Sequence, residues 1–366
     1  MDEPTNHLDQ EARETVKTYL SGKKGFILVS HDRDFLDACI DHILVLNRQS
    51  IEVQSGNFSS WEENKRRRDA SAEKENEKHK KEIVKLEKAA RQAKGWSDQT
   101  EKSKIGQKTA GLKPDRGYIG HKAAKMMKRS KTLEHRKEDA IREKEGLLKD
   151  VETLAELKMQ PLVHHKEVLL EADNLGLRYP ESDTWLFQNL KMELRKGERV
   201  FLHGANGCGK STLIKAVLKT AGYGKGAADH FWNLQEQGRL TLASGLVISY
   251  VSQDTSYLNG SIRKFCEEQG LEESLFCAVL RQMGVEREQF TKELQEYSEG
   301  QKKKIQIAES LLTPAHLYLW DEPLNYVDVF TRMQIEEVLL RYKPTMLIVE
   351  HDARFRERIA TKIVEL

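Results

Sequence analysis

The most specific chemical pattern in the sequence is GANGCGKST, which occupies residues 204–212. It fits G-x-x-x-x-G-K-[ST] and lies between the apolar stretches RVFLH and LIKAVLKTA, as a phosphate-binding loop lies between a strand and a helix. Its glycines let backbone N–H groups close around phosphate oxygens, and Lys210 would reach the β- and γ-phosphates. Ser211 would supply a ligand to Mg²⁺. The pattern therefore predicts a site for ATP with Mg²⁺.

Two adjacent carboxylates could complete such a site. The stretch LYLWDE at residues 317–322 reads as an apolar strand that ends in Asp321 and Glu322. One carboxylate would belong to the Mg²⁺ shell, and the other would polarise a water molecule.

Three further stretches come after the phosphate-binding loop in the sequence. Gln253 stands in ISYVSQD, YSEGQ at residues 297–301 leads into the helical run KKKIQIAESLL, and His351 follows MLIVEHD. The Ser and Gly backbone of YSEGQ would form an anion site at a helix N-terminus. Taken singly, a surface glutamine, a helix-capping serine and a histidine with satisfied hydrogen bonds are the better interpretations. Their order after a phosphate-binding loop favours an ATPase.

The beginning of the chain repeats its end. DEPTNHLD at 2–9 matches DEPLNYVD at 321–328, VSHDRDF at 29–35 matches VEHDARF at 349–355, and HILVL at 42–46 resembles KIVEL at 362–366. A repeat at this distance indicates duplicated domains. The second copy is expected to be complete from about residue 167, whereas the first copy is expected to retain only its end. The second copy has 154 residues, 167–320, for which the first copy has no counterpart.

The residues between the copies predict a long antiparallel helical hairpin. Residues 61–94 contain no Pro or Gly and are rich in helix formers, and residues 121–158 form a second run of this kind. A loop at 95–120 would join them, and it contains Trp96 and Tyr118. A solvated spacer remains an alternative for the outer parts of both arms.

Charge is concentrated in this middle region. Between Arg91 and Lys131 there are twelve Lys and Arg but three acidic residues, a local charge of +9, so the remainder carries −7 of the total of +2. Basic side chains together with exposed aromatic rings suit contact with phosphates and unpaired bases. The region therefore predicts one local contact with a polyanion.

Composition sets the remaining bounds. The chain has 366 residues, enough for two domains or for one domain with a large insertion. It has no run of membrane-spanning length and no signal-peptide profile at its start. Its four cysteines lack metal-ligand spacing and fit a reducing cytosol. They are Cys39, Cys208, Cys266 and Cys277.

In this order, the motifs resemble those of ATP-binding cassettes, and the whole chain resembles the ABC-F proteins. TNHLD in the first copy, two tandem cassettes and a charged hairpin between them are typical of that family. DEPLNYVD, the basic loop and GYIGHKAAKMMKRSK at 117–131 look like its antibiotic-resistance branch, the Lsa/Vga type. The resemblance implies an α/β fold, with a complete P-loop NTPase cassette, a helical hairpin linker and a C-terminal remnant of a first cassette. The implied domains are residues 1–58, 59–165 and 166–366.

The resemblance also implies roles for individual residues. Glu322 would be the general base, His351 the switch histidine and Gln253 the Q-loop residue, with Ser211, Gln253 and Asp321 around Mg²⁺. Tyr179 would stack on adenine, although core packing is the alternative. The implied nucleotide contacts are Tyr179, Gly204, Asn206, Gly207, Gly209, Lys210, Ser211, Thr212, Ser298, Gly300 and Gln301. Asp2, Glu3 and His31 would be the remnant of the first site. Tyr297, Glu299 and Tyr326 depart from the usual residues at their positions.

In the family, each ATP lies between the P-loop of one cassette and the signature loop of the other. The chain contains one P-loop, at 204–212, and one signature, at 297–301, and these would serve different sites. We therefore expect ATP binding with poor hydrolysis by the monomer, because charge stabilisation needs donors from both sides. The chain is expected to be the C-terminal portion of a longer protein, with a head-to-tail homodimer as the alternative.

The implied function is protection of the bacterial ribosome from antibiotics that bind the peptidyl-transferase centre. The hairpin and its loop at 95–120 would contact rRNA and P-site tRNA, and hydrolysis would release the protein. Lincosamides, pleuromutilins and streptogramin A are the drug classes that the resemblance suggests. An ABC-F translation factor without a drug role is the main alternative, and the ATPase subunit of a transporter is a weaker one.

Overall fold

The computed structural model describes residues 1–4, 8, 10–46, 51–102, 157–223 and 234–366. The chain divides into two compact units, of which one contains residues 1–59 and 154–366 and the other residues 60–153. We call residues 1–59 the first segment and residues 166–366 the cassette. Among the described helices, none is long and apolar enough to cross a membrane.

A five-stranded parallel sheet is the centre of the cassette, with the strand order β10-β5-β9-β8-β7. Its strands are β5 (Arg199–His203), β7 (Ile248–Val251), β8 (Leu317–Asp321), β9 (Met346–Val349) and β10 (Lys362–Glu365). Every residue of β8 and β9 is buried. Such continuous apolar strands form because helices cover a parallel sheet on both faces.

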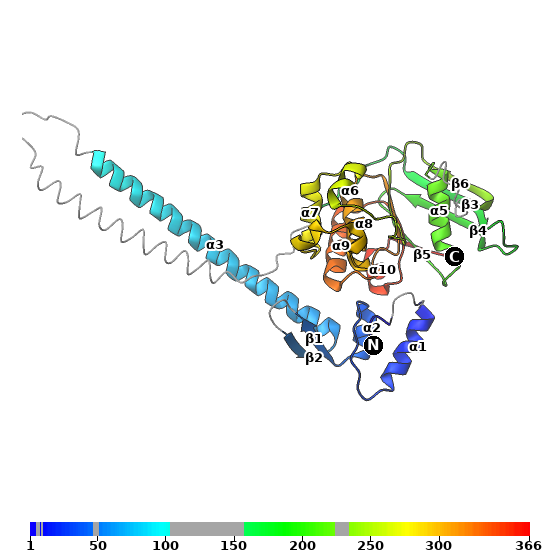
Figure 1. Cartoon of the computed structure of the whole chain (residues 1–366), viewed down its shortest axis with the longest axis horizontal. Helices are drawn as coiled ribbons and strands as arrows, with labels where there is room; N and C mark the ends of the chain where they lie inside the picture. Colours follow the sequence, from blue (N-terminus) through cyan, green and yellow to red (C-terminus); the bar gives the residue numbers. More distant parts are fainter. Residues whose placement is uncertain (5–7, 9, 47–50, 103–156, 224–233) are drawn as a thin grey trace, which may run out of the picture. The chain divides into compact units, whose positions relative to one another are not determined.

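A second sheet has three antiparallel strands in the order β4-β3-β6. The strands are β3 (Val168–Arg178), β4 (Phe187–Arg195) and β6 (Gln235–Leu242). Helices α6 to α9 gather at one side of the cassette, and this antiparallel sheet lies at the other (Figure 1). The helical elements of the cassette are α5 (Lys210–Thr220), α6 (Ile262–Gln269), α7 (Glu273–Gln282), α8 (Glu299–Leu312), α9 (Val329–Tyr342) and α10 (Ala353–Ile359), with 3-10 turns η2 (Arg287–Thr291) and η3 (Leu294–Glu296).

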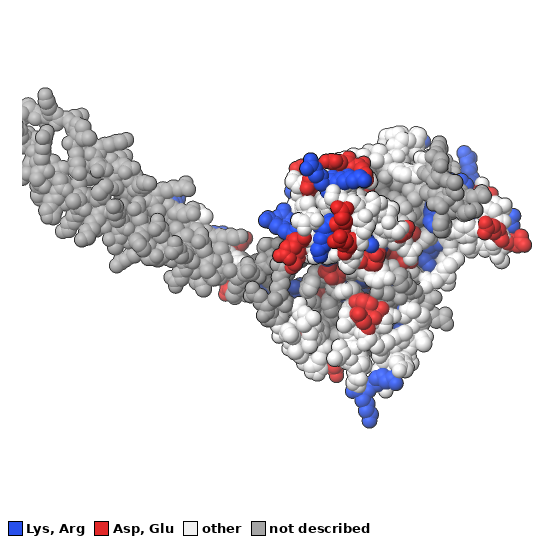
Figure 2. Space-filling model, in the orientation of Figure 1, with Lys and Arg blue, Asp and Glu red and all other residues white. Residues whose placement is uncertain are grey.

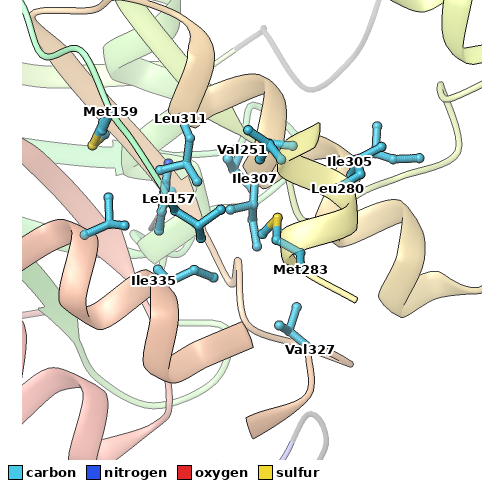
Figure 3. Close-up of a cluster of buried hydrophobic side chains, with 14 of the residues drawn as sticks. Leu157, Met159, Val251, Leu280, Met283, Ile305, Ile307, Leu311, Val327 and Ile335 are labelled. Atoms are coloured by element: carbon cyan, nitrogen blue, oxygen red, sulfur yellow. The ribbon is translucent and has the colours of Figure 1, made fainter. Parts of the chain in front are cut away.

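The largest apolar cluster packs α7, α8 and α9 against the parallel sheet (Figure 3). Leu157 and Met159 belong to this cluster, although the sequence assigns them to the linker, and each is 2 % exposed. Leu162 donates its backbone N–H to the carbonyl oxygen of Ala315 at 2.8 Å. Residues 157–165 have neither helical nor strand structure, so the predicted second helical arm does not reach residue 158.

The first segment reproduces the end of the cassette. A parallel bridge joins Asp2 to Val29, and Asp32 caps α2 as Asp352 caps α10, each accepting the N–H of the phenylalanine three residues later. Its elements are α1 (Gln10–Ser21), α2 (Arg33–Cys39), β1 (His42–Leu46) and β2 (Ile51–Ser55), and β1 pairs with β2 in an antiparallel hairpin. The repeat read from the sequence is thus a repeat of structure.

The two copies differ in how their equivalent strand residues are covered. Ile27 and Val29 are 83 % and 50 % exposed, whereas Leu347 and Val349 at the equivalent positions are 0 % exposed. In the cassette, β5 and β8 flank β9 on both sides. The exposed residues of the first segment therefore lie where the cassette has neighbouring strands.

Helix α3 (Phe58–Lys102) is a single helix of 45 residues. It continues through Gly95 and Trp96, so residues 95–102 of the predicted loop are helical in the structure. Gly within a helix costs about 1 kcal/mol, and a long helix tolerates that cost. Residues 103–120 of the predicted loop and residues 121–156 of the predicted second arm lie outside the described residues.

Candidate functional site

The predicted functional residues meet at one edge of the parallel sheet. The phosphate-binding loop follows β5, His351 follows β9, Glu322 follows β8 and Gln253 follows β7. These four strands are consecutive neighbours in the sheet. Because parallel strands present their carboxyl ends at the same edge, motifs that are far apart in sequence converge there.

The phosphate-binding loop has a backbone that glycine permits. Gly204, Gly207 and Gly209 have φ angles of 151°, 81° and 106°. A Cβ on Gly204 would lie 2.8 Å from the carbonyl oxygen of Leu366 and from the sulfur of Cys208. The loop can therefore keep this path only with glycine at that position.

Helix α5 begins at Lys210, within the stretch 204–212, and its N-cap residue Gly209 provides no side chain to accept the first N–H groups. Such N–H groups attract phosphate oxygens. The Nζ atom of Lys210 lies 2.8 Å from the carbonyl oxygens of Gly204 and Ala205, so the ammonium group is held within the loop. Asn206 and Gly207 are exposed.

Asp321 is a buried carboxylate at the end of β8. Its Oδ1 accepts a hydrogen bond from the hydroxyl of Ser211 at 3.0 Å. Burial raises the pKa of Asp321 to about 6, and the hydrogen bond from Ser211 opposes that shift. Two oxygen ligands at this separation suit a hard cation such as Mg²⁺, which would also neutralise the buried charge.

Glu322 is surrounded by polar groups from three other positions. Its Oε2 accepts hydrogen bonds from Nε2 of Gln253 at 2.9 Å and from Nδ2 of Asn325 at 2.7 Å. Nε2 of His351 lies 3.6 Å from Oε1 of the same carboxylate. The structure thus brings together the three residues for which the sequence predicts catalytic roles.

Asn325 and Lys303 also belong to this site, and the sequence reading did not assign them roles. Lys303 is 2 % exposed and donates from Nζ to the carbonyl oxygen of Ser252 at 2.6 Å, directly before Gln253. Burial lowers the pKa of Lys303, while Asp321 and Glu322 favour its charged form. The position of Asn325 three residues after Glu322 could have indicated its role. Lys303 follows YSEGQ in a run of three lysines, and nothing in the sequence distinguishes it from the other two.

Tyr179 lies beside the phosphate-binding loop. Its hydroxyl is 3.0 Å from Oγ1 of Thr212, and its ring packs against a second apolar cluster, which includes Leu177 of β3 and Leu213 of α5. This position suits an aromatic contact with a nucleotide base, and it equally suits core packing.

The predicted signature residues lie at the start of α8. Ser298 is the N-cap and accepts the N–H of Gln301 at 3.3 Å, while Oε1 of Gln301 accepts the N–H of Ser298 at 3.1 Å. A Cβ on Gly300 would lie 2.4 Å from the carbonyl oxygen of Tyr326. Ser298 therefore has the helix-capping role that its sequence context also allowed, and Gly300 permits close packing of α8 on the loop after β8.

The first segment contains a histidine–glutamate pair like that of His351 and Glu322. Nε2 of His31 lies 3.3 Å from Oε1 of Glu3, and both Glu3 and Glu322 have positive φ angles, of 41° and 49°. The backbone N–H of Glu3 bonds to the carbonyl of Val29 at 2.8 Å, beside which Asp2 forms its bridge. Burial raises the pKa of Glu3 and lowers the pKa of His31. Residues 5–7 and 9 of the first-copy motif lie outside the described residues.

The basic region at residues 91–131 begins on α3, which ends at Lys102. Its side chains lie outside the described residues, so its contact with a polyanion stays a prediction. On the face drawn in Figure 2, acidic and basic side chains of the described residues are interspersed.

Known proteins that are similar in sequence to the chain include ATP-binding proteins, as the geometry of the site leads one to expect. Residues 187–325 match the family described as ABC transporter. The chain is 27 % identical to the ribosome protection protein VmlR of Bacillus subtilis, over 98 % of the chain and 62 % of that protein. It is 25 % identical to the ATP-binding protein Uup of Buchnera aphidicola, over 99 % of the chain and 55 % of that protein. The chain spans about half to three-fifths of the length of the curated relatives it matches, with coverages of 51 %, 62 % and 55 %.

A solved structure described as the ATP-binding subunit of an ABC transporter is 23 % identical, with a TM-score of 0.43 over 54 % of the chain and 85 % of that structure. The family match and the sheet topology confirm the predicted fold class, a P-loop NTPase cassette of the ABC type. The cassette therefore has the fold of an ABC ATP-binding domain, and the proteins similar to the chain include ABC-F proteins.

Proposed function

We propose that the cassette binds ATP with Mg²⁺. We also propose that the chain is part of an ABC-F ATPase that protects the bacterial ribosome from antibiotics. One observation carries the ATPase part of this proposal. The carboxylate of Glu322 is held between Gln253, Asn325 and His351, and the adjacent buried carboxylate of Asp321 is bonded to Ser211. A water-activating base beside a phosphate-binding loop is what hydrolysis of a phosphoanhydride requires.

Each residue would have a defined task in the reaction. The N–H groups at the start of α5 and the ammonium group of Lys210 would bind the β- and γ-phosphates. Ser211 and Asp321 would hold Mg²⁺, which neutralises charge on the phosphate oxygens when it is bound. Glu322 would accept a proton from the attacking water, and Gln253 and Asn325 would keep its carboxylate oriented. His351 would be placed to contact the γ-phosphate.

We further propose that the chain supplies only one side of each ATP site. In this proposal, Ser298, Gly300 and Gln301 would face a nucleotide bound to a different P-loop, and the loop at 204–212 would need a signature from elsewhere. The monomer would then bind ATP and hydrolyse it slowly, because donors from the second side would be missing.

The test of this part compares Glu322→Gln with the unaltered chain. ATP binding, measured by fluorescence of a labelled nucleotide, should stay within about twofold, and hydrolysis should fall at least about 100-fold by loss of the base. The specific activity of the unaltered chain, measured over a wide range of protein concentrations, should be constant. A specific activity that rises with concentration would instead indicate a homodimer that completes both sites. Failure to bind ATP would refute the proposal.

The ribosomal part of the proposal is supported by similarity to VmlR and by the basic region. A local charge of +9 between Arg91 and Lys131 suits rRNA or tRNA phosphates. The drug classes against which we propose protection are lincosamides, pleuromutilins and streptogramin A, and the proposed compartment is the cytoplasm. An ABC-F translation factor without a drug role is the second candidate, because Uup matches at nearly the same identity and its name states only ATP binding.

Cosedimentation with bacterial ribosomes would test the ribosomal part. The protein for this test contains the Glu322→Gln cassette together with the second P-loop and the second signature that would complete the sites. It should remain bound to ribosomes in ATP, and this binding should weaken with salt because phosphate contacts release counterions. Deletion of residues 96–119 should abolish drug protection. Retained ribosome binding without any protection phenotype would favour the translation factor, and absence of cosedimentation would refute both.

A further inference from the structure

Glu350 is a buried carboxylate that contacts two loops of the candidate site. It is 5 % exposed and directly precedes the switch residue His351. Its Oε2 accepts the backbone N–H of Leu324 at 3.1 Å. Its Oε1 accepts the N–H of His351 at 2.7 Å and that of Asp352 at 3.3 Å. One oxygen therefore binds the loop after β8, and the other binds the loop after β9.

Arg332 on α9 joins the same two loops through different atoms. Its Nη2 donates to the carbonyl oxygen of Leu324 at 2.8 Å and its Nε to that of Val327 at 2.9 Å. Its Nη1 donates to Oδ2 of Asp352 at 3.1 Å. Leu324 is thus fixed through its N–H by Glu350 and through its carbonyl by Arg332.

The joined loops carry the reacting groups. Residues 323–328, which we call the D-loop, include Asn325 and begin directly after Glu322. Glu322 and Tyr326 have φ angles of 49° and 62°, which residues other than glycine rarely adopt. Such a backbone persists only where surrounding contacts determine it, and the hydrogen bonds to Glu350 and Arg332 are contacts of this kind. Val327 is buried in the apolar cluster near Met283 and Ile335 (Figure 3), and Leu324 is buried in the same cluster.

The first segment provides an internal comparison. Arg13 occupies the position of Arg332 and donates to the carbonyl of Leu8 at 3.0 Å, and it also pairs with Asp32. Ser30, however, stands where the cassette has Glu350, and its hydroxyl accepts the N–H of Asp32 at 3.2 Å. The arginine half of the arrangement is therefore repeated, but a serine offers one oxygen where Glu350 offers two.

We propose that Glu350 is a positioning residue that makes the D-loop and the switch residue His351 respond to bound nucleotide as one unit. Contact of a γ-phosphate with His351 would then move Leu324, and with it Asn325 and the base Glu322. This inference rests on the proposed ATP site, because ATP with Mg²⁺ is the ligand to which the unit would respond.

Hydrogen exchange of the full chain without nucleotide tests the first half of the inference. In Glu350→Ser, which installs the residue of the first copy, the amides of Leu324 and His351 should exchange at least about tenfold faster than in the unaltered chain, because each loses its acceptor. Glu350→Gln keeps one oxygen acceptor and should accelerate only one of the two amides. Ser30→Ala is the matched control and should leave both amides unchanged. Rates within twofold in both Glu350 variants would overturn the inference.

Exchange in the presence of ATP and Mg²⁺ tests the coupling. In the unaltered chain, nucleotide should slow exchange in residues 204–211 and in 323–328. In Glu350→Ser, nucleotide should still slow exchange in residues 204–211 but should no longer slow it in 323–328. A variant that was only less stable would not lose the response in one loop alone. Equal responses of the D-loop in both forms would contradict the coupling. If residues 204–211 do not respond even in the unaltered chain, the proposed ATP site fails, while the measurement without nucleotide still decides the role of Glu350.

Kinetics give a further readout that a purely structural role would not produce. Glu350→Ser should lower kcat for ATP at least about tenfold while KM stays within about twofold, because loss of positioning affects the transition state more than ground-state binding. If Glu350→Ser does not fold, as judged by circular dichroism, Glu350→Gln takes its place in each measurement. A proportional rise in KM with unchanged kcat would contradict the positioning role.

Discussion

The guanidinium group of Arg33 donates a hydrogen bond to the carboxylate of Glu336, although 303 positions separate the two residues in the sequence. Their side chains are 1 % and 0 % exposed. The other oxygen of Glu336 accepts from Arg358 at 2.7 Å, and Asp352 lies 3.8 Å from Arg33. A buried network of charges therefore joins α2 of the first segment to α9 and α10 of the cassette.

Removing one partner of this network should destabilise the protein strongly. In Arg33→Met, the free energy of unfolding measured by urea denaturation should fall by about 3 kcal/mol, because Glu336 would keep a buried charge with fewer donors. The control is Arg67→Met on α3, where the Arg67–Glu63 pair has side chains 73 % and 64 % exposed. That change should alter stability by less than about 0.5 kcal/mol.

The double variant Arg33→Met with Glu336→Leu should recover part of the loss, because an apolar pair leaves no buried carboxylate without its donor. If the two single effects simply add, the pair is not coupled, and the buried network does not hold the first segment on the cassette in the way that we infer.

The fold of the cassette and the main residues of its site could be predicted because their signals are local. The stretch at 204–212 needs glycines at fixed positions for its backbone path, and that need is visible in the sequence. Asp321, Glu322 and His351 end or follow apolar strands, and parallel strands bring such ends together.

The residues that the sequence did not reveal depend on contacts over long distances. Lys303 bonds to a carbonyl 51 positions away, and Glu350 bonds to an amide 26 positions away. Lysines and glutamates are common, and only the packing of α8 and the D-loop gives these two their roles. The extent of α3 was missed for a different reason, since Gly95 favours a break but the helix continues to Lys102.

Asn325 should matter for turnover more than for binding. Asn325→Ala removes one of the donors to Oε2 of Glu322, so kcat for ATP should fall about tenfold or more while KM stays within about twofold. Asn325→Asp should be slower still at pH 7, because a second carboxylate would repel Glu322. The control is Asn259→Ala, whose amide donates to the carbonyl of Tyr257 and which should leave kcat unchanged. A larger effect on KM than on kcat would contradict this role.

Glu309 on α8 should make stability depend on pH. Burial raises the pKa of its carboxyl to about 7 from an ordinary value of 4.5. Between these values the folded state binds more protons than the unfolded state, so stability should fall as the pH rises through this window. The effect of Glu309→Gln on the free energy of unfolding should therefore depend on pH. The effect at pH 8 should be more stabilising than the effect at pH 4.5 by about 2–3 kcal/mol.

Urea denaturation at the two pH values measures this difference. The matched control is the exposed residue Glu288, for which the Gln variant should have the same effect at both values. If Glu309→Gln and the unaltered chain show the same change in stability between pH 4.5 and pH 8, the carboxyl of Glu309 is not the source of the dependence.

Two substitutions of Tyr179 should separate nucleotide contact from core packing. Tyr179→Phe keeps the ring and loses the hydroxyl that lies 3.0 Å from Oγ1 of Thr212, so stability should fall by about 1 kcal/mol while ATP affinity stays within about twofold. Tyr179→Ala removes the ring. It should weaken ATP binding about tenfold, because stacking of a base on an aromatic ring contributes about 1–3 kcal/mol. Fluorescence titration with labelled ATP and urea denaturation measure the two quantities. If Tyr179→Ala lowers stability by about 3 kcal/mol and leaves affinity unchanged, the ring only fills the core, and another side chain must contact the adenine.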